Sequence, residues 1–370
     1  MLYSPIFQPE GLIDFCGKLM KTYRSLYPQI ISFENLYLAF RKARKGKRDR
    51  REVAAFELDL EPHLFRLQAE LATHTYTPGP YRNFYIRERK LRLISAAPFS
   101  DRVVHHALCR VLAPIWEARF IHDTYACRED KGTHKALDRC QHFARRYPYV
   151  LQCDIHQFFP AIDLAILRDK LARRIQDDEA LWLIDRILEG GAGVLAPMYE
   201  PEWFPGDNLL APLRPRGLPI GNLTSQTWAN VYLDSLDHFI KRELKCPAYL
   251  RYCDDFLLFG DDKATLHAWK DAVQDHLNGL RLALNWRRST VYPTHTGIPF
   301  LGFRLFPTHR RLRADNVRLA SQRLRANRDA CRTGRMSRAR FRESLLAWIA
   351  HASHGDTYQL RKAMLRKVTL

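Results

Sequence analysis

Apolar residues follow two different spacings along this chain. A spacing of three to four residues predicts helices over residues 33–72, 101–118, 131–146, 163–188, 263–277 and most of 218–239. Short continuous or alternating apolar runs predict strands over residues 81–95, 149–154, 250–260, 282–292 and 300–306. A Gly- and Pro-rich stretch, residues 189–216, interrupts this pattern and is predicted to be a long loop or an insertion. The chain is therefore predicted to be α+β.

Two adjacent carboxylates, Asp254 and Asp255, break the apolar run of residues 250–260. Such a pair suits the tight turn of a hairpin, and on a solvated tip it would carry no chemistry. Here the flanks are almost wholly apolar, so the acids are expected at the end of a buried hairpin, where each raises the pKa of the other unless a cation neutralises them. Asp154 also ends an apolar strand. Three carboxylates on neighbouring strand ends can hold two divalent ions about 4 Å apart, as in phosphoryl transfer.

The charge balance indicates a polyanionic partner. Among 370 residues, Lys and Arg number 59 against 40 Asp and Glu, which gives a net charge of +19. A surplus of this size most often accompanies nucleic acid. Arginines recur through the helical last 60 residues, which form a candidate lobe that grips a phosphate backbone, and the basic run 41–51 is either a solvated loop or a further phosphate contact. A membrane-surface role is disfavoured, because no basic helix has a broad apolar face.

The cysteines and the chain ends bear on location. The eight cysteines are scattered without a C-x-x-C pair, which argues against a zinc knuckle or a disulfide framework and for a reducing compartment. The first residues lack the basic start and apolar block of a signal peptide, and no apolar run approaches the length of a membrane span. A cytoplasmic location is expected.

Several short segments resemble those of reverse transcriptases. Tyr252-Cys253-Asp254-Asp255 looks like their Y-x-D-D box, and residues 154–163 (DIHQFFPAID) resemble their D-I-x-x-F-F-x-x-I-D box. Phe300-Leu301-Gly302-Phe303 is similar to the F-L-G box that grips the primer end, and residues 125–134 resemble the bacterial Y-x-x-R-P-x-x-G-x-x-H segment. These boxes occur in the family's order over residues 75–305, so together they are far more specific than any one of them.

One box points to a branch of that family. Residues 217–226 (GLPIGNLTSQ) resemble the G-x-P-I-G-N-x-T-S-Q box of diversity-generating retroelement reverse transcriptases. Retroviral and intron-encoded enzymes usually carry Gln where Ile220 stands and Pro where Gln226 stands. Residues 101–109 and 124–128 also look closest to this group, whereas the 189–216 loop departs from its most compact members. Defence-associated and group II intron-like reverse transcriptases of bacteria are related to it.

The resemblance implies a right-hand polymerase fold. Its parts would be an N-terminal helical extension with fingers in residues 1–75, fingers in 76–148, a palm with an antiparallel sheet and the insertion in 149–308, and a helical basic thumb in 309–370. The implied activity is that of an RNA-directed DNA polymerase, a nucleotidyltransferase that copies a structured RNA into cDNA. The implied partners are the RNA template, an RNA or DNA primer end, deoxynucleotides, two Mg²⁺ ions with Mn²⁺ as an alternative, and a small accessory protein, with no membrane.

The resemblance also assigns roles to single residues. Asp154, Asp254 and Asp255 would be catalytic metal ligands. Lys90 and Arg92 would neutralise the incoming triphosphate, unless they only line a solvated ribbon. Residues near the nascent pair would be Phe159, Ile220 and Gln226, with the Phe159 ring excluding a 2′-hydroxyl unless it is simply core. The primer grip would be Phe300, Leu301 and Gly302, and further nucleic-acid contacts would be Arg128, Arg313, Arg318 and Arg325. Because Ile220 is apolar where a Gln would probe pairing, error-prone copying is predicted.

Three other functions compete with this interpretation. A phage-defence reverse transcriptase would use the same chemistry with a different RNA. A non-catalytic RNA-binding protein on a degenerate polymerase scaffold is disfavoured, because such a scaffold has no physical reason to keep three clustered acids. A metal-dependent nuclease is disfavoured by the lack of a second acidic or histidine cluster in the sequence.

Overall fold

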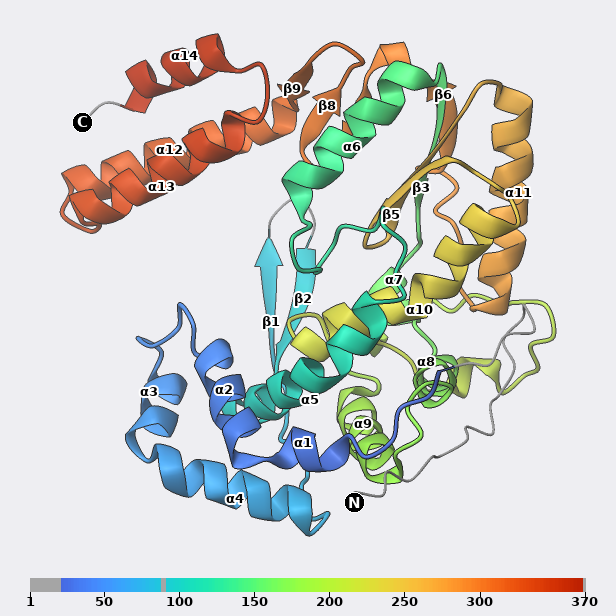
Figure 1. Cartoon of the computed structure of the whole chain (residues 1–370). Helices are drawn as coiled ribbons and strands as arrows, with labels where there is room; N and C mark the ends of the chain where they lie inside the picture. The colour runs from blue at the N-terminus through green and yellow to red at the C-terminus, as the bar shows by residue number, and fades with distance from the viewer. Residues whose placement is uncertain (1–20, 88–90, 369–370) are drawn as a thin grey trace, which may run out of the picture. The chain divides into compact units, whose positions relative to one another are not determined.

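The computed structural model describes residues 21–87 and 91–368 (Figure 1). Its chain divides into two compact units. Unit 1 consists of Met1–Ile121, Ile155–His238 and Gln274–Ala283. Unit 2 consists of His122–Asp154, Phe239–Val273 and Leu284–Leu370. Each unit therefore combines stretches that are distant in sequence. The fingers, palm and thumb boundaries expected from the sequence follow a different division and stay a prediction.

Unit 1 is mainly helical. Its helices are α1 (Tyr27–Ile31), α2 (Phe33–Ala43), α3 (Arg51–Leu58), α4 (Leu60–Ala72), α5 (Phe99–Glu117), α7 (Phe158–Ala161), α8 (Leu164–Ala172), α9 (Asp178–Gly191) and most of α10 (Leu223–Arg242). Helix α5 packs against α1, α2 and α3 and buries Val103, Val104 and Leu108 completely, because these residues recur on one helical face. Strands β1 (Arg82–Arg87) and β2 (Leu91–Ala96) pair antiparallel, which confirms the predicted ribbon.

Unit 2 is organised around an antiparallel sheet with the strand order β4-β5-β3-β6. The strands are β3 (Tyr149–Asp154), β4 (Ala248–Tyr252), β5 (Asp255–Gly260) and β6 (Thr290–Pro293). Helix α6 (Thr133–Arg146) packs on β4 and β5. Leu137 and Phe143 of this helix share one core with Leu257 and Phe259 of the sheet. The continuous apolar runs of β4 and β5 fit strands that are buried on both faces, because successive residues of both strands are buried.

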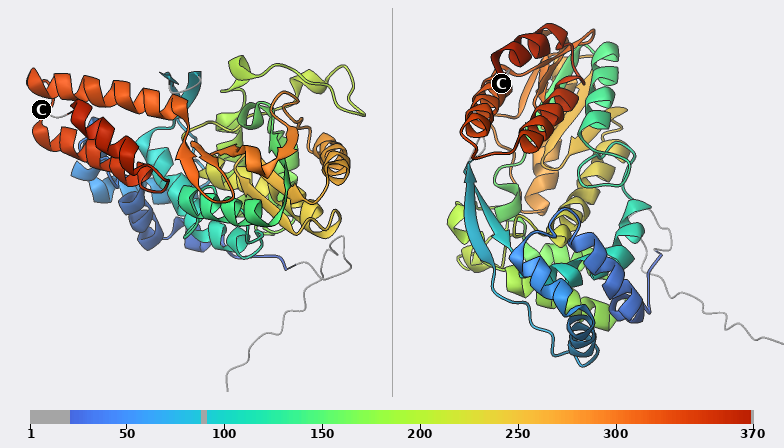
Figure 2. Two further views of the ribbon diagram at one scale, coloured as in Figure 1. Left: turned by 90° about the horizontal axis from the view of Figure 1, so that it is seen from above. Right: turned by 90° about the vertical axis from the view of Figure 1, so that its left-hand side faces the viewer.

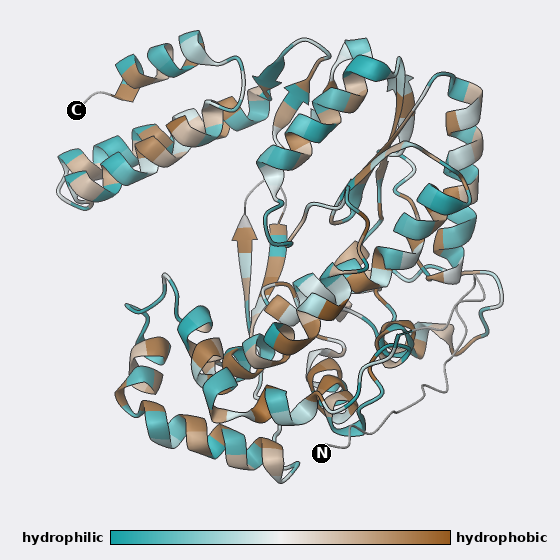
Figure 3. Cartoon of the chain, in the orientation of Figure 1, coloured by the Kyte–Doolittle hydropathy of each residue, from teal (hydrophilic) through white to brown (hydrophobic). Residues whose placement is uncertain are grey.

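The C-terminal part of unit 2 continues from a small second sheet into helices. The sheet contains β7 (Ile298–Phe300), β8 (Phe303–Leu305) and β9 (Arg310–Leu312), and the helices are α12 (Ala314–Arg332), α13 (Arg338–Ala352) and α14 (Tyr358–Val368). Helices α13 and α14 both pack on α12 (Figure 2). Leu324, Phe341, Met364 and Val368 form a small core among them. Hydrophilic residues cover most of α12 (Figure 3), so the helical, basic character expected of this part is confirmed.

Three details differ from the sequence-based expectation. The strand expected over residues 300–306 is divided between β7 and β8, because Leu301 and Gly302 form a turn with positive φ. The single helix expected over residues 163–188 is two helices, because the Asp177 side chain accepts a hydrogen bond from Ala180 N and starts α9 anew. The strand expected over 282–292 is shortened to β6, because residues 285–289 form a turn in which Ser289 N donates to Asn285 O. Within the described part of the chain, no helix has the length and apolar character needed to cross a membrane.

Candidate active site

Three carboxylates meet at one edge of the four-stranded sheet. Strands β3 and β5 pair antiparallel so that Asp154 lies directly opposite Asp255. Strands β4 and β5 form the predicted hairpin, in which Tyr252 pairs with Asp255 and the turn consists of Cys253 and Asp254. Cys253 takes a left-handed conformation with φ +60°, which allows this very short turn. The hairpin and the end of β3 thus bring together acids that are 100 positions apart in the sequence.

The negative charge at this edge is only partly balanced. Burial, followed by the neighbouring carboxylates Asp254 and Asp154, raises the pKa of Asp255 to about 7. Arg288 acts in the opposite direction, since its Nη1 lies 3.5 Å from Asp154 Oδ2. The Arg288 side chain is 49% exposed, whereas that of Asp154 is 14% exposed, so water screens the cation more than the acid. Burial and the neighbouring carboxylates therefore outweigh Arg288 in their effect on the pKa of Asp255.

The donor atoms at this edge suit a hard divalent cation. Carboxylate oxygens are the ligands that Mg²⁺ and Mn²⁺ prefer, and the charge imbalance around Asp255 favours a cation there. In the described ranges, however, no group of three or more His, Cys, Asp or Glu side chains is arranged to hold a metal ion. The role of Asp154, Asp254 and Asp255 as ligands of a catalytic ion stays a prediction.

A turn after α11 (Lys263–Gly279) fixes the position of Asp154. Asn285 N donates to Asp154 O at 2.7 Å, and Asp154 N donates to Ser289 Oγ at 3.4 Å. Lys270 Nζ in turn donates to Ser289 O at 2.7 Å. Sequence reasoning missed this support and also Arg288, because residues 282–292 were expected to be a strand.

The predicted primer-grip residues form the turn between β7 and β8. Phe300 is buried, Leu301 has φ +45° and Gly302 has φ +90°. The φ of +90° favours glycine at position 302, and a Cβ there would also lie 2.6 Å from Asn316 Nδ2. Gly302 O accepts hydrogen bonds from Asn316 Nδ2 at 2.8 Å and from Arg313 N at 3.1 Å. The turn is thereby tied to the start of α12, while its contact with a primer stays a prediction.

The residues expected near the nucleotide belong to unit 1. Lys90 lies outside the described residues, and Arg92 is exposed on β2. Ile220 is half-buried, with its carbonyl oxygen accepting from Ser95 N at 2.9 Å, and Gln226 is exposed on α10. These positions leave the predicted nucleotide roles untested.

The two phenylalanines of the α7 turn differ in burial. Phe158 is 3% exposed and Phe159 is partly exposed, and their rings meet edge to face at 5.4 Å. Phe158 is therefore core, as expected. The partial exposure of Phe159 is compatible with the predicted gate role and does not test it.

The four arginines expected to contact nucleic acid are not equivalent. Arg128 is half-buried, and its Nη1 donates to Thr124 Oγ1 at 2.5 Å, so it braces its own loop. Arg313 pairs with Asp315 at 3.2 Å. Arg318 and Arg325 are exposed on α12, so their guanidinium groups face solvent. Nucleic-acid contact stays a prediction for all four.

Three known proteins are similar to this chain. Protein YkfC of Escherichia coli K12 is 25% identical over 300 residues, which cover 69% of this chain and 74% of YkfC. The group II intron-encoded protein LtrA of Lactococcus lactis is 25% identical over 213 residues, so the chain spans only 33% of LtrA's length. An apo telomerase from Candida tropicalis, truncated from its C-terminal domain, superposes with a TM-score of 0.47 at 12% identity, over 66% of this chain and 59% of the telomerase chain.

A family model described as reverse transcriptase (RNA-dependent DNA polymerase) matches residues 83–305, which is more than half of the chain. Every box that carries the resemblance, from residue 125 to residue 303, lies inside this match. The mixed helix-and-sheet structure agrees with the right-hand polymerase fold of that family. Enzymes of the family generally use divalent metal ions such as Mg²⁺ and act on RNA templates and primers. The chain therefore belongs to the reverse transcriptase family and is an RNA-directed DNA polymerase.

Proposed function

We propose that this enzyme copies a structured RNA template into cDNA with low fidelity, as diversity-generating retroelement reverse transcriptases do. In this proposal Asp154, Asp254 and Asp255 hold two Mg²⁺ ions beside the growing 3′ end. The observation that carries the chemistry is the register pair Asp154–Asp255 at the sheet edge, with Asp254 in the adjoining turn and with excess negative charge around Asp255. When bound, the ions would activate the 3′-hydroxyl and stabilise the leaving pyrophosphate.

The chain's own residues supply the surroundings for this chemistry. Arg288 offsets part of the charge on Asp154, and the 285–289 turn holds the strand end in place. The exposed guanidinium groups of Arg318 and Arg325 on α12 suit phosphate oxygens. The net charge of +19 favours a long polyanion over a small substrate alone.

A primer-extension assay tests the polymerase proposal. The full chain is incubated with Mg²⁺, labelled deoxynucleotides, and a primer annealed either to an RNA template or to a DNA template of the same sequence. We expect extension on RNA that stops when EDTA is added. Degradation of the template without extension would instead support a nuclease, and RNA binding without either product would support a non-catalytic scaffold.

The mutagenic part of the proposal depends on Ile220. An apolar side chain cannot hydrogen-bond to a base pair, so it leaves mispairs less strongly rejected than glutamine would. We expect Ile220→Gln to lower the substitution rate by about two- to fivefold, a free-energy difference on the order of one hydrogen bond. Sequencing of cDNA made from one RNA template by both enzymes measures this rate. Equal rates would remove the link between Ile220 and low fidelity.

The biological setting is a separate part of the proposal. Retroelement and phage-defence enzymes of this family would share the chemistry and differ in the RNA they copy. Sequencing the RNA and cDNA that co-purify with the chain from its host distinguishes the two. A template repeat with scattered substitutions in its cDNA supports the retroelement, whereas a dedicated non-coding RNA copied faithfully supports defence.

A further inference from the structure

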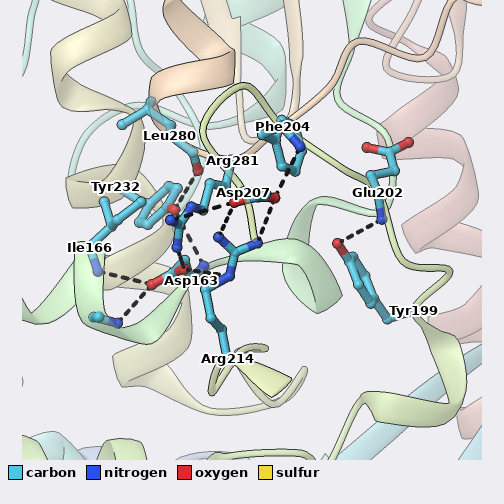
Figure 4. A network of polar contacts seen from close by, with 11 residues as sticks. Asp163, Ile166, Tyr199, Glu202, Phe204, Asp207, Arg214, Tyr232, Leu280 and Arg281 are labelled. Carbon is cyan, nitrogen blue, oxygen red and sulfur yellow. Dashed lines mark hydrogen bonds and ion pairs between the residues drawn. The ribbon is translucent and has the colours of Figure 1, made fainter. Parts of the chain in front are cut away.

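An ionic clasp closes the insertion (residues 189–216) within unit 1. The clasp consists of Asp163, Asp207, Arg214 and Arg281 (Figure 4). Arg214 binds Asp207 through two hydrogen bonds of 2.7 and 3.2 Å, and Arg281 Nη1 binds Asp163 Oδ2 at 2.9 Å. Two longer contacts, Arg214 Nε to Asp163 Oδ2 and Arg281 Nη2 to Asp207 Oδ1, both 3.6 Å, join the pairs into a ring. Two carboxylates thus meet two guanidinium groups.

The carboxylates of the clasp are almost fully shielded from water. The Asp163 and Asp207 side chains are 4% and 2% exposed. Asp163 Oδ1 is also occupied, because it accepts from Ala165 N and Ile166 N at the start of α8, and Asp207 Oδ2 accepts from Phe204 N at 3.0 Å. Removal of one carboxylate would leave two guanidinium groups facing a single acid, which is costly in a shielded site.

The clasp matters because the insertion holds the Phe159 turn (residues 156–163). Leu218 N, just after the insertion, donates to Phe159 O at 3.0 Å, and Gly217 N donates to Ile162 O at 2.9 Å. Further back, Glu200 N donates to Gln157 Oε1 at 2.9 Å. Two more contacts tie the turn to the insertion, from Leu164 N to Pro215 O at 3.1 Å and between His156 Nδ1 and Glu202 Oε1 at 2.8 Å.

Neither the Phe159 turn nor the insertion is held in place by its own secondary structure. Helix α7 in the turn has four residues, too few for a stable helix by itself. The insertion contains only two short 3₁₀ turns after α9, Ala196–Met198 and Ala211–Leu213. It buries Leu195 and Phe204, but four other large apolar side chains are 58–90% exposed: Trp203, Leu209, Leu210 and Leu213. Polar contacts therefore carry much of the anchorage of both segments.

Building on the gate role proposed for Phe159, we propose that Asp207 is a positioning residue for sugar selection. It closes the clasp, the closed clasp fixes the insertion, and the insertion fixes the backbone of the Phe159 turn. A gate that excludes one hydroxyl group by contact must be held within a fraction of an ångström. When the clasp opens, the Phe159 ring gains freedom to move away from a ribose 2′-hydroxyl, and discrimination against ribonucleotides falls.

The test measures discrimination directly. The full chain extends a primer on RNA by one nucleotide, dCTP or CTP, opposite guanine, and the ratio of the two kcat/KM values gives the discrimination. The variants are Asp207→Ala, the near-isosteric Asp207→Asn, Phe159→Ala and the double variant Asp207→Ala/Phe159→Ala. Leu209→Ser is the matched control, because Leu209 belongs to the same insertion and is 90% exposed. Thermal unfolding of each variant sets an assay temperature at which all are folded.

We expect Asp207→Ala to lower the discrimination about three- to tenfold, the size of effect usual for a residue that acts through another. Leu209→Ser should leave it unchanged. In the Phe159→Ala background, Asp207→Ala should have no further effect, because the ring through which it acts is gone. Hydrogen exchange of the amides in residues 157–163 should rise in both Asp207 variants, which provides a reading if the alanine variant is too unstable to assay.

Two results would overturn the positioning role. The first is unchanged discrimination in folded Asp207 variants, whatever the exchange in the Phe159 turn. The second is an equal loss with and without the Phe159 ring, since Asp207 would then act by another route. If the wild type does not extend the primer, the proposed function itself is wrong. If it does and Phe159→Ala lowers discrimination while the Asp207 variants do not, only the role of Asp207 is wrong.

Discussion

Two groups of aspartates in this chain differ in how their charge is balanced. At the sheet edge, burial and the neighbouring Asp254 and Asp154 raise the pKa of Asp255 to about 7, and Arg288 offsets only part of the charge. In the ionic clasp, the hydrogen bonds from Arg214 lower the pKa of Asp207. Each group places partly or nearly buried carboxylates close together. The clasp provides one guanidinium for each carboxylate, whereas Arg288 pairs with Asp154 and leaves the pKa of Asp255 raised.

This difference separates a site for chemistry from a structural contact. A group of carboxylates with too little positive charge nearby favours an added cation, and cations are what phosphoryl transfer uses. A group with matched charges gains nothing from a further ion and loses stability when one partner is removed. Residue type does not distinguish the two groups, since both consist of aspartates beside apolar segments. The position of the arginines does.

The largest effect is expected at the sheet edge. Asp154→Asn or Asp254→Asn should lower nucleotide incorporation by about 10³-fold or more, because each removes a charge that would hold the catalytic ions. RNA binding should remain close to that of the wild type, since it depends on the basic surface. Primer extension and a filter-binding assay with the same RNA measure the two properties.

Asp261→Asn provides the matched control for this pair. Asp261 follows β5 in the same unit and is exposed, so the same chemical change is made away from the three acids. Its incorporation rate should stay within about twofold of the wild type, as expected for a solvated surface charge. Near-normal synthesis by Asp154→Asn or Asp254→Asn would contradict the metal-ligand assignment.

The next largest effect is expected in the Phe159 turn, where Phe158 is expected to serve packing and Phe159 the selection of deoxynucleotides. Phe158→Ala should destabilise unit 1 by about 3–5 kcal/mol, because a buried ring leaves a cavity, without changing the preference for deoxynucleotides. Phe159→Ala should lower that preference about tenfold or more by removing a steric clash. Thermal unfolding and the dCTP to CTP ratio measure the two outcomes. A Phe159→Ala enzyme that still rejects ribonucleotides would exclude the gate.

Replacing one aspartate by asparagine should change the stability of the protein in opposite directions in the two groups. For Asp255 the folded-state pKa is raised, so its contribution to stability is present at low pH and is lost as the pH rises through about 7. For Asp207 the folded-state pKa is lowered, so the contribution of this carboxylate to stability is present at neutral pH and is lost in acid. At pH 8 in EDTA, Asp255→Asn should therefore raise the unfolding temperature and Asp207→Asn should lower it, each by about 2–4 °C.

The same measurement at pH 5 sharpens this contrast. There Asp255 is largely protonated in the folded protein, so Asp255→Asn should raise the unfolding temperature by less than at pH 8, whereas Asp207→Asn should still lower it. Added Mg²⁺ at pH 8 should stabilise the wild type and not Asp255→Asn. Two shifts of the same sign at pH 8 would show that the charge balance of the two groups does not differ as described.

The sequence predicted the sheet edge better than the clasp for a physical reason. The acids end apolar strands, and strand length, hairpin turn and register follow from local pattern, so Asp154 and Asp255 could be placed on neighbouring strand ends. The clasp joins Asp163 to Arg281 across 118 positions, and no local pattern predicts that pair. Asp177 is similar, because its carboxylate both starts α9 and accepts from Leu26 N and Tyr27 N, about 150 positions away.

The smallest effect is expected at Arg288, whose charge partly offsets that of the acids at the sheet edge. Arg288→Gln removes the guanidinium beside Asp154, so the acids should bind a divalent ion more tightly. Because Arg288 is half-exposed, the gain should be modest, with the Mg²⁺ concentration for half-maximal synthesis falling about two- to fourfold. Arg287→Gln is the matched control, since its guanidinium lies over the Trp286 ring, 5.0 Å from the ring centroid. A higher Mg²⁺ requirement in Arg288→Gln alone would mean that Arg288 organises the acids, and charge balance would then not separate the two groups.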